Sequence, residues 1–131
     1  HDRLAISGAA ALGGTLNISF VNGYTPRATE TFTILTASSI SGAFSTVHFP
    51  ALSGGGLRLI YGPTSVSVAF CYANCDGSSA SPTLNVLDFG CFLNKFAAGD
   101  AYANCDGSTT PPVLNVLDFS CFLNRFAAGC P

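Results

Sequence analysis

The sequence predicts an α+β fold, in which a small all-β part, either a sandwich or a sheet, precedes a disulfide-bonded pair of loop–helix repeats. Residues 1–70 are β-rich runs broken by glycines and contain no cysteine. All six cysteines lie beyond Phe70. The same region contains a tandem repeat. These three observations divide the chain into domains at residues 1–70 and 71–131.

Residues 1–70 are expected to form short strands, because their runs alternate or are β-branched and glycine-rich turns separate them. The expected strands are Leu4–Ser7, Thr15–Phe20, Thr31–Thr36, Phe44–Phe49, Leu57–Tyr61 and Ser65–Phe70. A β layer of this size has marginal stability alone, and its open edges would seek a partner strand.

The second half is a tandem repeat, in which residues 71–99 align with residues 101–129 and are identical at 22 of 29 positions. Each copy ends in an apolar segment whose large residues recur at helical spacing. A glycine follows each segment at the position of a helix C-terminal cap. The segments predict two helices with core-facing stripes, formed by Phe89, Phe92, Leu93 and Phe96 in one copy and by Phe119, Phe122, Leu123 and Phe126 in the other.

Each copy also carries a cluster of oxygen-bearing side chains ahead of its helix. Calcium prefers six to eight hard oxygen ligands around a tightly turned loop. In the first copy Asn74 and Asp76 alternate, Gly77 permits a sharp turn, and Asn85 and Asp88 share one face of the first helical turn. An Asx turn before an ordinary helix start is the alternative, and the duplication favours calcium. The predicted ligands of two Ca²⁺ ions are Asn74, Asp76, Ser78, Asn85, Asp88, Asn104, Asp106, Ser108, Asn115 and Asp118.

The six cysteines indicate a disulfide framework, since their number is even and their spacing regular. A zinc cluster is disfavoured because the chain has no C-x-x-C pair. Cys75 and Cys91 occupy the same places as Cys105 and Cys121, so each loop is tied to its own helix or the ties cross between copies. Cys71 and Cys130 remain, and would clasp the two ends of the repeat pair.

Residues 72–129 resemble the dockerin type I family in its cysteine-containing variant. The resemblance lies in the paired Asn-x-Asp-Gly and Asn-x-x-Asp motifs and the helices after them. It implies two calcium sites and an anchoring role toward a cohesin-like partner. Three features depart from the family: Tyr72 and Tyr102 replace the usual first Asp, the loops are longer, and the last ligand is Asp. Residues 1–70 loosely resemble the closing segment of secreted bacterial β-solenoid and adhesin-like proteins, in a Gly-Tyr-Thr-Pro turn and a Phe-Thr-Ile-Leu-Thr strand.

Composition excludes several classes of function. Charged residues make up 9% of the chain and the net charge is −2, so the chain lacks the excess of basic residues that is typical of nucleic-acid-binding proteins. No apolar run approaches the ~20 residues of a membrane span. The absence of Met indicates that a signal peptide was removed or that this is a piece of a longer chain. The expected location is therefore extracellular, at a bacterial cell surface or in a fibre.

No catalytic constellation is apparent. His48 is expected to point outward from a strand, and Glu30 is the only Glu in the chain. The sequence favours a non-enzymatic structural subunit of a fibre or surface layer that binds copies of itself. In that hypothesis Leu4, Ala5, Ile6 and Ser7 add as a strand to another copy. The alternatives are an anchoring module or an accessory domain of a polysaccharide-degrading enzyme. Two hydroxyl-rich inserts offer attachment points for glycans.

Overall fold

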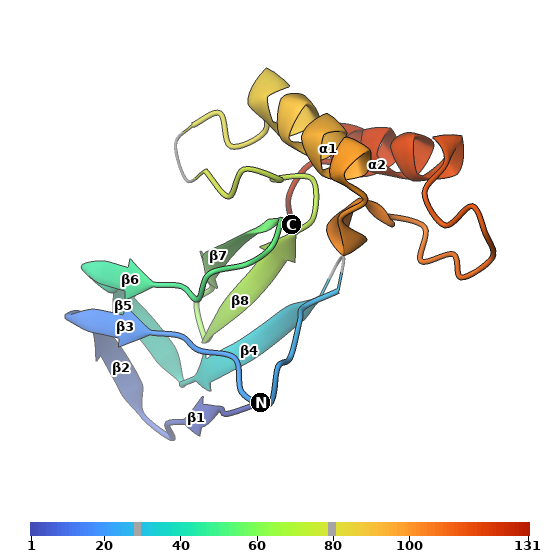
Figure 1. Cartoon of the computed structure of the whole chain (residues 1–131). Coiled ribbons are helices and arrows are strands. Elements are labelled where there is room, and N and C mark those ends of the chain that lie inside the picture. Colours follow the sequence, from blue (N-terminus) through green and yellow to red (C-terminus); the bar gives the residue numbers. More distant parts are fainter. Residues whose placement is uncertain (28–29, 79–80) are drawn as a thin grey trace. The chain divides into compact units, whose positions relative to one another are not determined.

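The computed structural model describes residues 1–27, 30–78 and 81–131 (Figure 1). Part of the first hydroxyl-rich insert, residues 79–80, lies outside the described residues. The chain divides into two compact units. The first comprises His1–Leu52 and Leu57–Phe70, and the second comprises Ser53–Gly56 and Cys71–Pro131. The first unit thus ends at Phe70, where the sequence changes character, while the short Ser53–Gly56 segment belongs to the second unit.

In the described residues eight strands precede the helices, and the predicted α+β class is confirmed. The strands are β1 (Leu4–Ala5), β2 (Ala9–Leu12), β3 (Thr15–Asn17), β4 (Thr31–Thr36), β5 (Ser39–Gly42), β6 (Thr46–His48), β7 (Gly56–Tyr61) and β8 (Ser65–Cys71).

The first six strands form two stacked turns of chain, which we call the first coil (β1–β3) and the second coil (β4–β6). Each strand of the first coil pairs in parallel with its counterpart in the second: β1 with β4, β2 with β5, and β3 with β6 (Figure 1). Leu4 lies opposite Leu35, Ala9 opposite Ser39, and Thr15 opposite Thr46. The register offset between the coils, 35 − 4 on one face and 39 − 9 on the next, is therefore nearly constant around the stack.

The expected sandwich or single sheet is thus replaced by a three-sided parallel stack. Strands β2 and β5 were not expected from the sequence. Alanine and glycine have low strand propensity, so Ala9–Leu12 is typical of a flexible link and Ser39–Gly42 of a turn. Their extended conformation comes from pairing with each other across the stack, which is a tertiary effect.

Strand β8 follows the second coil and pairs antiparallel with β4, on the side of β4 opposite β1. Strand β7 is hydrogen-bonded to the other edge of β8. The buried cluster inside the coils is small or aliphatic and consists of Ala10, Leu35, Ala37 and Val66. A compact interior of this kind needs no large side chains, because adjacent coils already lie at strand spacing.

The second unit contains two α-helices and a short 3₁₀ helix between them: α1 (Val86–Ala98), η1 (Ala101–Ala103) and α2 (Val116–Ala128). Gly99 ends α1 with φ +71°, the left-handed conformation that glycine adopts without strain. Lys95 and Arg125 lie in the last turns, where a cation opposes the helix dipole. No helix in the described ranges is both long and apolar enough to cross a membrane.

Candidate calcium sites

The two repeats pack together through aromatic rings. Phe92 of α1 and Phe122 of α2 are both fully buried, and they stack with centroids 4.3 Å apart and planes 17° apart. Phe89 meets Phe122, and Phe92 meets Phe119, so the contacts are reciprocal. Reciprocal contacts between equivalent residues are the mark of twofold symmetry. The repeats are therefore related by an approximate twofold axis between the two central phenylalanines.

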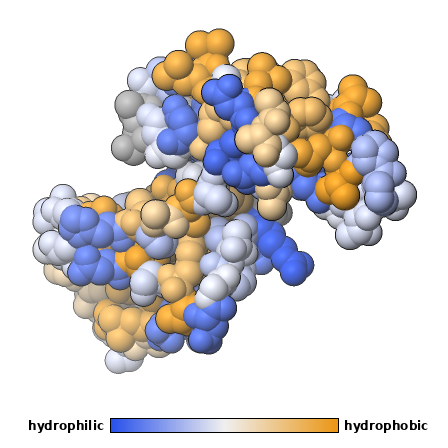
Figure 2. All heavy atoms as spheres, viewed as in Figure 1, coloured by the Kyte–Doolittle hydropathy of each residue, from blue (hydrophilic) through white to orange (hydrophobic). Residues whose placement is uncertain are grey.

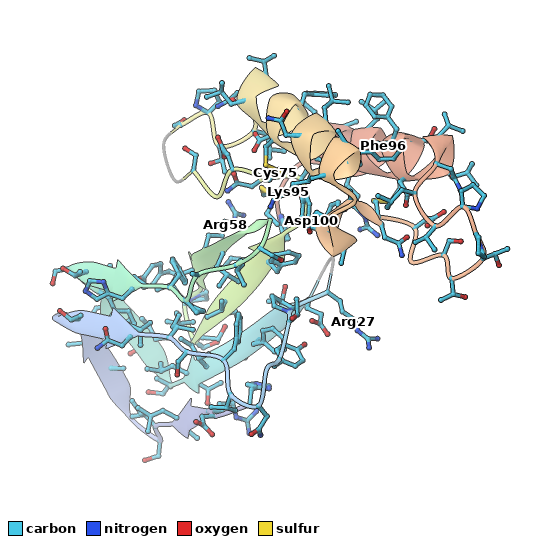
Figure 3. All side chains as sticks on the ribbon, viewed as in Figure 1. Arg27, Arg58, Cys75, Lys95, Phe96 and Asp100 are labelled. Carbon is cyan, nitrogen blue, oxygen red and sulfur yellow. A yellow bond between two sulfur atoms is a disulfide. The ribbon has the colours of Figure 1, made fainter. Side chains whose placement is uncertain are left out.

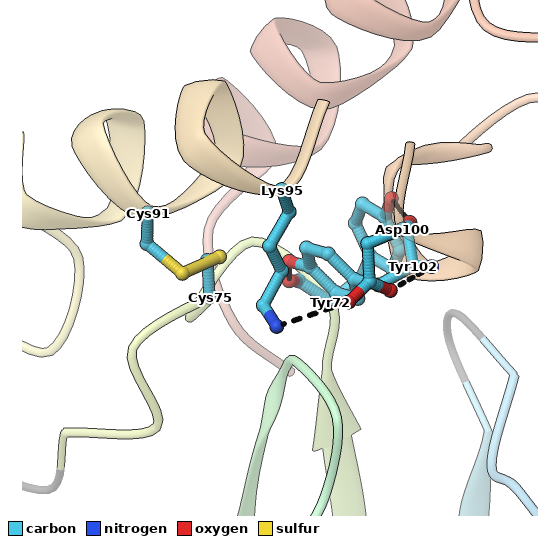
Figure 4. A network of polar contacts seen from close by, with 6 residues as sticks. All are labelled: Tyr72, Cys75, Cys91, Lys95, Asp100 and Tyr102. Atoms are coloured by element: carbon cyan, nitrogen blue, oxygen red, sulfur yellow. Dashed lines mark hydrogen bonds and ion pairs between the residues drawn. A yellow bond between two sulfur atoms is a disulfide. The ribbon is translucent and has the colours of Figure 1, made fainter. Parts of the chain in front are cut away.

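Two tyrosines form a second layer of this interface (Figure 4). Tyr72 and Tyr102 stack with centroids 4.5 Å apart, and each hydroxyl donates a hydrogen bond to the other residue's backbone carbonyl. Burial raises the pKa of both hydroxyls, which keeps them protonated as donors. Lys95 lies 5.8 Å from the Tyr102 ring, and Arg125 lies 5.6 Å from the Tyr72 ring. Each cation thus contacts the ring of the opposite repeat.

The three predicted disulfides are confirmed, and the pairing within each repeat is local. Cys75 is joined to Cys91 (Figures 3 and 4), and Cys105 is joined to Cys121, so each loop is tied to its own helix. Cys71 is joined to Cys130, which clasps the ends of the repeat pair as expected. All six cysteines of the chain are therefore oxidised.

The first loop brings four of its five predicted ligands together. The Asn74 amide nitrogen donates to the Ser78 carbonyl over 2.9 Å, and the Ser78 amide donates to the Asp76 carboxylate over 2.9 Å. The Asp76 amide donates to Oδ1 of Asp88 over 3.3 Å. Gly77 turns the loop with φ +68°. The loop is therefore closed by its own hydrogen bonds and tied to Asp88 in the first turn of α1.

The second loop repeats this arrangement closely. Asn104 donates to the Ser108 carbonyl over 3.0 Å, and the Ser108 amide donates to Asp106 over 2.9 Å. The Asp106 amide donates to Asp118 over 3.2 Å. Gly107 has φ +69°. Two loops of different insert sequence thus reach the same geometry, which indicates that the shared residues determine it.

The side-chain oxygens of Asn85 and Asn115, which were predicted as calcium ligands, cap the two helices in this structure. Each residue is the N-cap of its helix and accepts a 2.8 Å hydrogen bond from a backbone amide two residues later. Each helix also has a capping box, because Asp88 and Asp118 accept hydrogen bonds from the N-cap amides. In this structure the expected Asn-x-x-Asp ligand pair therefore caps the helix. Only its aspartate also accepts a hydrogen bond from the loop.

Two buried amide oxygens without a partner test whether a cation fits these loops. Oδ1 of Asn74 and Oδ1 of Asn104 are buried and accept no hydrogen bond from any residue that the structure describes. A buried acceptor without a donor costs roughly 1–3 kcal/mol, so such atoms are rare in native proteins. They occur at equivalent positions in both repeats, and the amide nitrogen of each asparagine donates to a carbonyl of its own loop. A hard cation in each loop would bind the unpartnered amide oxygen of that loop, so the residues present fit calcium.

The carboxylates of the same two loops favour the same ion. Asp88 and Asp118 are both fully buried. Burial raises the pKa of Asp88, and the nearby Asp76 carboxylate raises it further. A bound cation would stabilise the two charges of such a pair. Within the described ranges no three His, Cys, Asp or Glu side chains converge, so each loop would rely on two carboxylates plus neutral oxygens.

In comparisons with known proteins, no family model, no curated protein and no solved structure matches the chain.

The two loops differ in what covers them. Gly54 lies so close to Tyr102 that a Cβ there would come within 2.4 Å of the ring. A Cβ on Gly56 would come within 2.3 Å of the Asn74 side chain. Asn74 is accordingly buried, whereas Asn104 is half-buried. The triple glycine of Ser53–Gly56 therefore covers the first loop and rests on the tyrosine pair, and nothing in the sequence had marked it as more than a turn.

The predicted core stripe is only partly correct. Phe92 and Phe122 are buried, but Leu93 is 50% exposed and Leu123 36% exposed. The first helical turns also expose Val86 and Leu87 in α1 and their equivalents Val116 and Leu117 in α2. Apolar surface on the helical unit is visible in Figure 2. The two leucines were expected in the core because residues at i, i+3 and i+4 lie on one face of a helix. In the structure the phenylalanine rings fill only part of that face.

The remaining predicted residues lie in the first unit. His48 is exposed at the end of β6, as expected for an outward strand residue. Leu4 and Ala5 form β1, and the Ile6 amide donates to the Thr36 carbonyl over 2.8 Å. The segment expected to act as a free donor strand is thus already paired on one edge within its own chain. Any contact it makes with another molecule must use the opposite edge.

Proposed function

We propose that this chain is a non-catalytic, extracellular structural module whose tandem repeat binds two calcium ions and docks to a partner protein. The observation that carries the proposal is the pair of buried, unpartnered amide oxygens on Asn74 and Asn104. Each lies in a loop with two carboxylates and a main-chain carbonyl. The residues that would hold the ions are Asn74, Asp76, Ser78 and Asp88, and Asn104, Asp106, Ser108 and Asp118.

Calcium here would serve structure. With two carboxylates per loop we expect dissociation constants of about 10⁻⁴–10⁻³ M, the range of extracellular modules. At 10 mM calcium such sites stabilise the folded state by about 1.4 to 2.7 kcal/mol each. Three disulfides support the same setting, because they persist in oxidising compartments.

Isothermal titration calorimetry with CaCl₂ tests the calcium assignment. We expect two ions per chain, and one ion in Asn74→Leu, since leucine fills the space but offers no oxygen. Asp2→Asn is the matched control, because it removes an acidic group from an exposed position far from either loop in the sequence. Absence of binding at 10 mM calcium in the disulfide-intact chain would refute the assignment.

The docking role is supported by the duplicated apolar residues at the start of each helix. Val86 and Val116 are 77% and 73% exposed, which is unusual for large aliphatic side chains. Since they are equivalent in the two repeats, the module would present two similar faces. We expect Val86→Asn with Val116→Asn to leave calcium binding unchanged while weakening the binding of a cohesin domain. Equal binding of the double variant and the parent chain would remove this role.

A second candidate is a subunit of a self-assembling fibre, made of copies of this chain. It is favoured by the N-terminal strands, whose residues 4–20 carry no charge to guard a β edge. Such an interface would bury more than about 800 Å² per partner. Light scattering of the calcium-loaded chain at high concentration tests it, and a single monomer peak would rule it out.

A further inference from the structure

The two ends of the coil stack are not alike. At one end, β8 covers β4, and the turn before β8 reaches β5, where the Pro63 carbonyl accepts from the Ile40 amide over 2.9 Å. The Thr64 carbonyl accepts from the Ala37 amide over 2.9 Å, and the Tyr61 hydroxyl accepts from the Phe44 amide over 3.2 Å. This end is therefore covered at β4 and reached by a turn at β5, whereas β6 pairs only with β3 among the described residues.

At the other end lie β1, β2 and β3, each of which has, within the part of the chain that the structure describes, a strand partner on one edge only. The hydrogen bonds that leave this coil at Ile6, Gly8, Gly14 and Ile18 all run to the second coil. Strand edges in native proteins are usually blunted by charges, prolines or bulges. No charged residue occurs between Leu4 and Pro26. We call this surface the open edge.

The interior of the first coil is also incompletely covered. Ala10 is buried, but the aliphatic side chains of Ile6, Leu12, Leu16 and Ile18 are only half-buried. In the second coil the β4 face has strand neighbours on two sides, and Leu35 and Ala37 are buried there, whereas Ile40 and Val47 on the other two faces are half-buried. An apolar layer at the same strand spacing would complete the burial of the first coil.

We infer that the open edge is a docking surface for a partner β coil that stacks on β1–β3 in parallel, with aliphatic residues at its interior positions. The surface continues the register that already joins the two coils, in which Leu4 lies opposite Leu35 and Ala9 opposite Ser39. This interaction does not depend on the calcium sites.

A second copy of this chain is a poorer occupant for a geometric reason. Head-to-tail stacking would bring the open edge against an end where β8 already occupies the edge of β4 and its preceding turn already reaches β5. Face-to-face stacking of two open edges would reverse the strand directions. The three faces differ in length, with two, four and three residues in β1, β2 and β3, so reversal would mismatch two of them. Only a parallel coil places each face on one of its own kind.

The test is a three-coil chain, made by inserting a second copy of residues 4–34 in front of Leu4 in the full protein. Because Leu4 and Leu35 are register partners, this insertion reproduces the existing stacking relation. We expect a monomer in which the amides of the original β1–β3 exchange with solvent at least about tenfold more slowly than in the parent chain. The control carries the same inserted segment in scrambled order.

Equal exchange in the scrambled and ordered chains would overturn the inference. A parent chain that dimerises with these amides already protected would also overturn it, in favour of a second copy as occupant. If the three-coil chain does not fold, a peptide of residues 31–48 is added to the parent chain instead. Chemical-shift changes confined to β1–β3 are expected with this peptide and not with its scrambled form, and no change at millimolar peptide would overturn the inference.

Discussion

The coil pair of the first unit and the repeat pair of the second both arise from two successive stretches of about the same length, yet they are joined differently. The coils stack by translation, with each strand parallel to its counterpart and a nearly constant register offset. The repeats meet by rotation, as the reciprocal hydrogen bonds between Tyr72 and Tyr102 show. Rotation closes the second pair on itself, whereas translation leaves the first pair with an open edge.

This difference also explains why the two repeats are much more similar in sequence than the two coils. A twofold interface uses every contact twice, so Phe92 and Phe122, or Tyr72 and Tyr102, must match. A stack requires only compatible aliphatic residues at interior positions, such as Leu16 over Val47 or Ala10 over Ile40. The rotated pair is therefore nearly identical in sequence, and the translated pair is not.

Removal of a ring from the twofold axis should give the largest effect. We expect Phe92→Ala to destabilise the second unit by roughly 4 to 5 kcal/mol, because the side chain is fully buried and loses its stack on Phe122. Denaturant unfolding in calcium measures this change. Leu93→Ala, at the neighbouring exposed position, should cost far less. Equal losses in the two variants would contradict the twofold packing.

The disulfide that clasps the repeat pair should come next. Cys71 and Cys130 are separated by 59 residues, so in the chain-entropy model their bond contributes about 4 kcal/mol. The Cys105–Cys121 bond spans 16 residues and should contribute about 3 kcal/mol. Paired Cys→Ala variants, compared by chemical denaturation, test this order. A larger loss of stability on removing the Cys105–Cys121 bond would show that native packing, rather than chain entropy, determines how much each disulfide contributes.

The triple glycine should distinguish the two candidate calcium loops, which the rotation otherwise makes equivalent. Gly56→Ala would push the Asn74 side chain, so we expect weaker calcium binding at the first loop and unchanged binding at the second. Gly54→Ala would push the Tyr102 ring and should destabilise the second unit by about 1 to 3 kcal/mol. Calorimetry with calcium and thermal unfolding measure the two effects.

Gly90 provides the matched control for these glycine variants. It lies within α1, and no atom approaches within 4 Å of a Cβ placed there. Gly90→Ala should therefore stabilise the chain by roughly 0.5 to 1 kcal/mol, since alanine has the higher helix propensity. A loss of stability at all three positions would mean that the close approaches of Gly54 and Gly56 are not the cause.

The sequence predicted the second unit far better than the first. The helices, the disulfides and the grouping of Asn74, Asp76 and Asp88 follow from local periodicity and from an evident repeat. The coil stack depends on pairing between segments that lie far apart in the chain and are only loosely related in sequence, and β2 has weak strand propensity. The capping role of Asn85 could have been inferred from its place before an apolar helix with an acid three residues later.

The smallest expected effect concerns acid, and it separates the two units by mechanism. In the second unit, if the proposed calcium sites are filled, acid would act by displacing the ions, because their ligands must be deprotonated. In the first unit the responsive group is Glu30, whose Oε2 accepts 2.6 Å hydrogen bonds from the Arg27 amide and from the Tyr24 hydroxyl. These bonds hold the pKa of Glu30 below its ordinary value, with the Arg27 amide as the main cause. The same contact raises the pKa of Tyr24.

The sign of the acid effect follows from the lowered pKa. Above the unfolded-state pKa of about 4.3 the ionised side chain contributes its full stability, which is lost as the pH falls through the lower folded-state value. The loss should be small, because the group is exposed and salt screens it. An NMR titration should place the Glu30 midpoint below that of a free glutamate, and Tyr24→Phe should move it back toward that value. In Glu30→Gln the Tyr24 midpoint should fall toward about 10, its ordinary value. A Glu30 midpoint that does not respond to Tyr24→Phe would mean that the hydroxyl contact is absent in solution and that the Arg27 amide alone holds this segment.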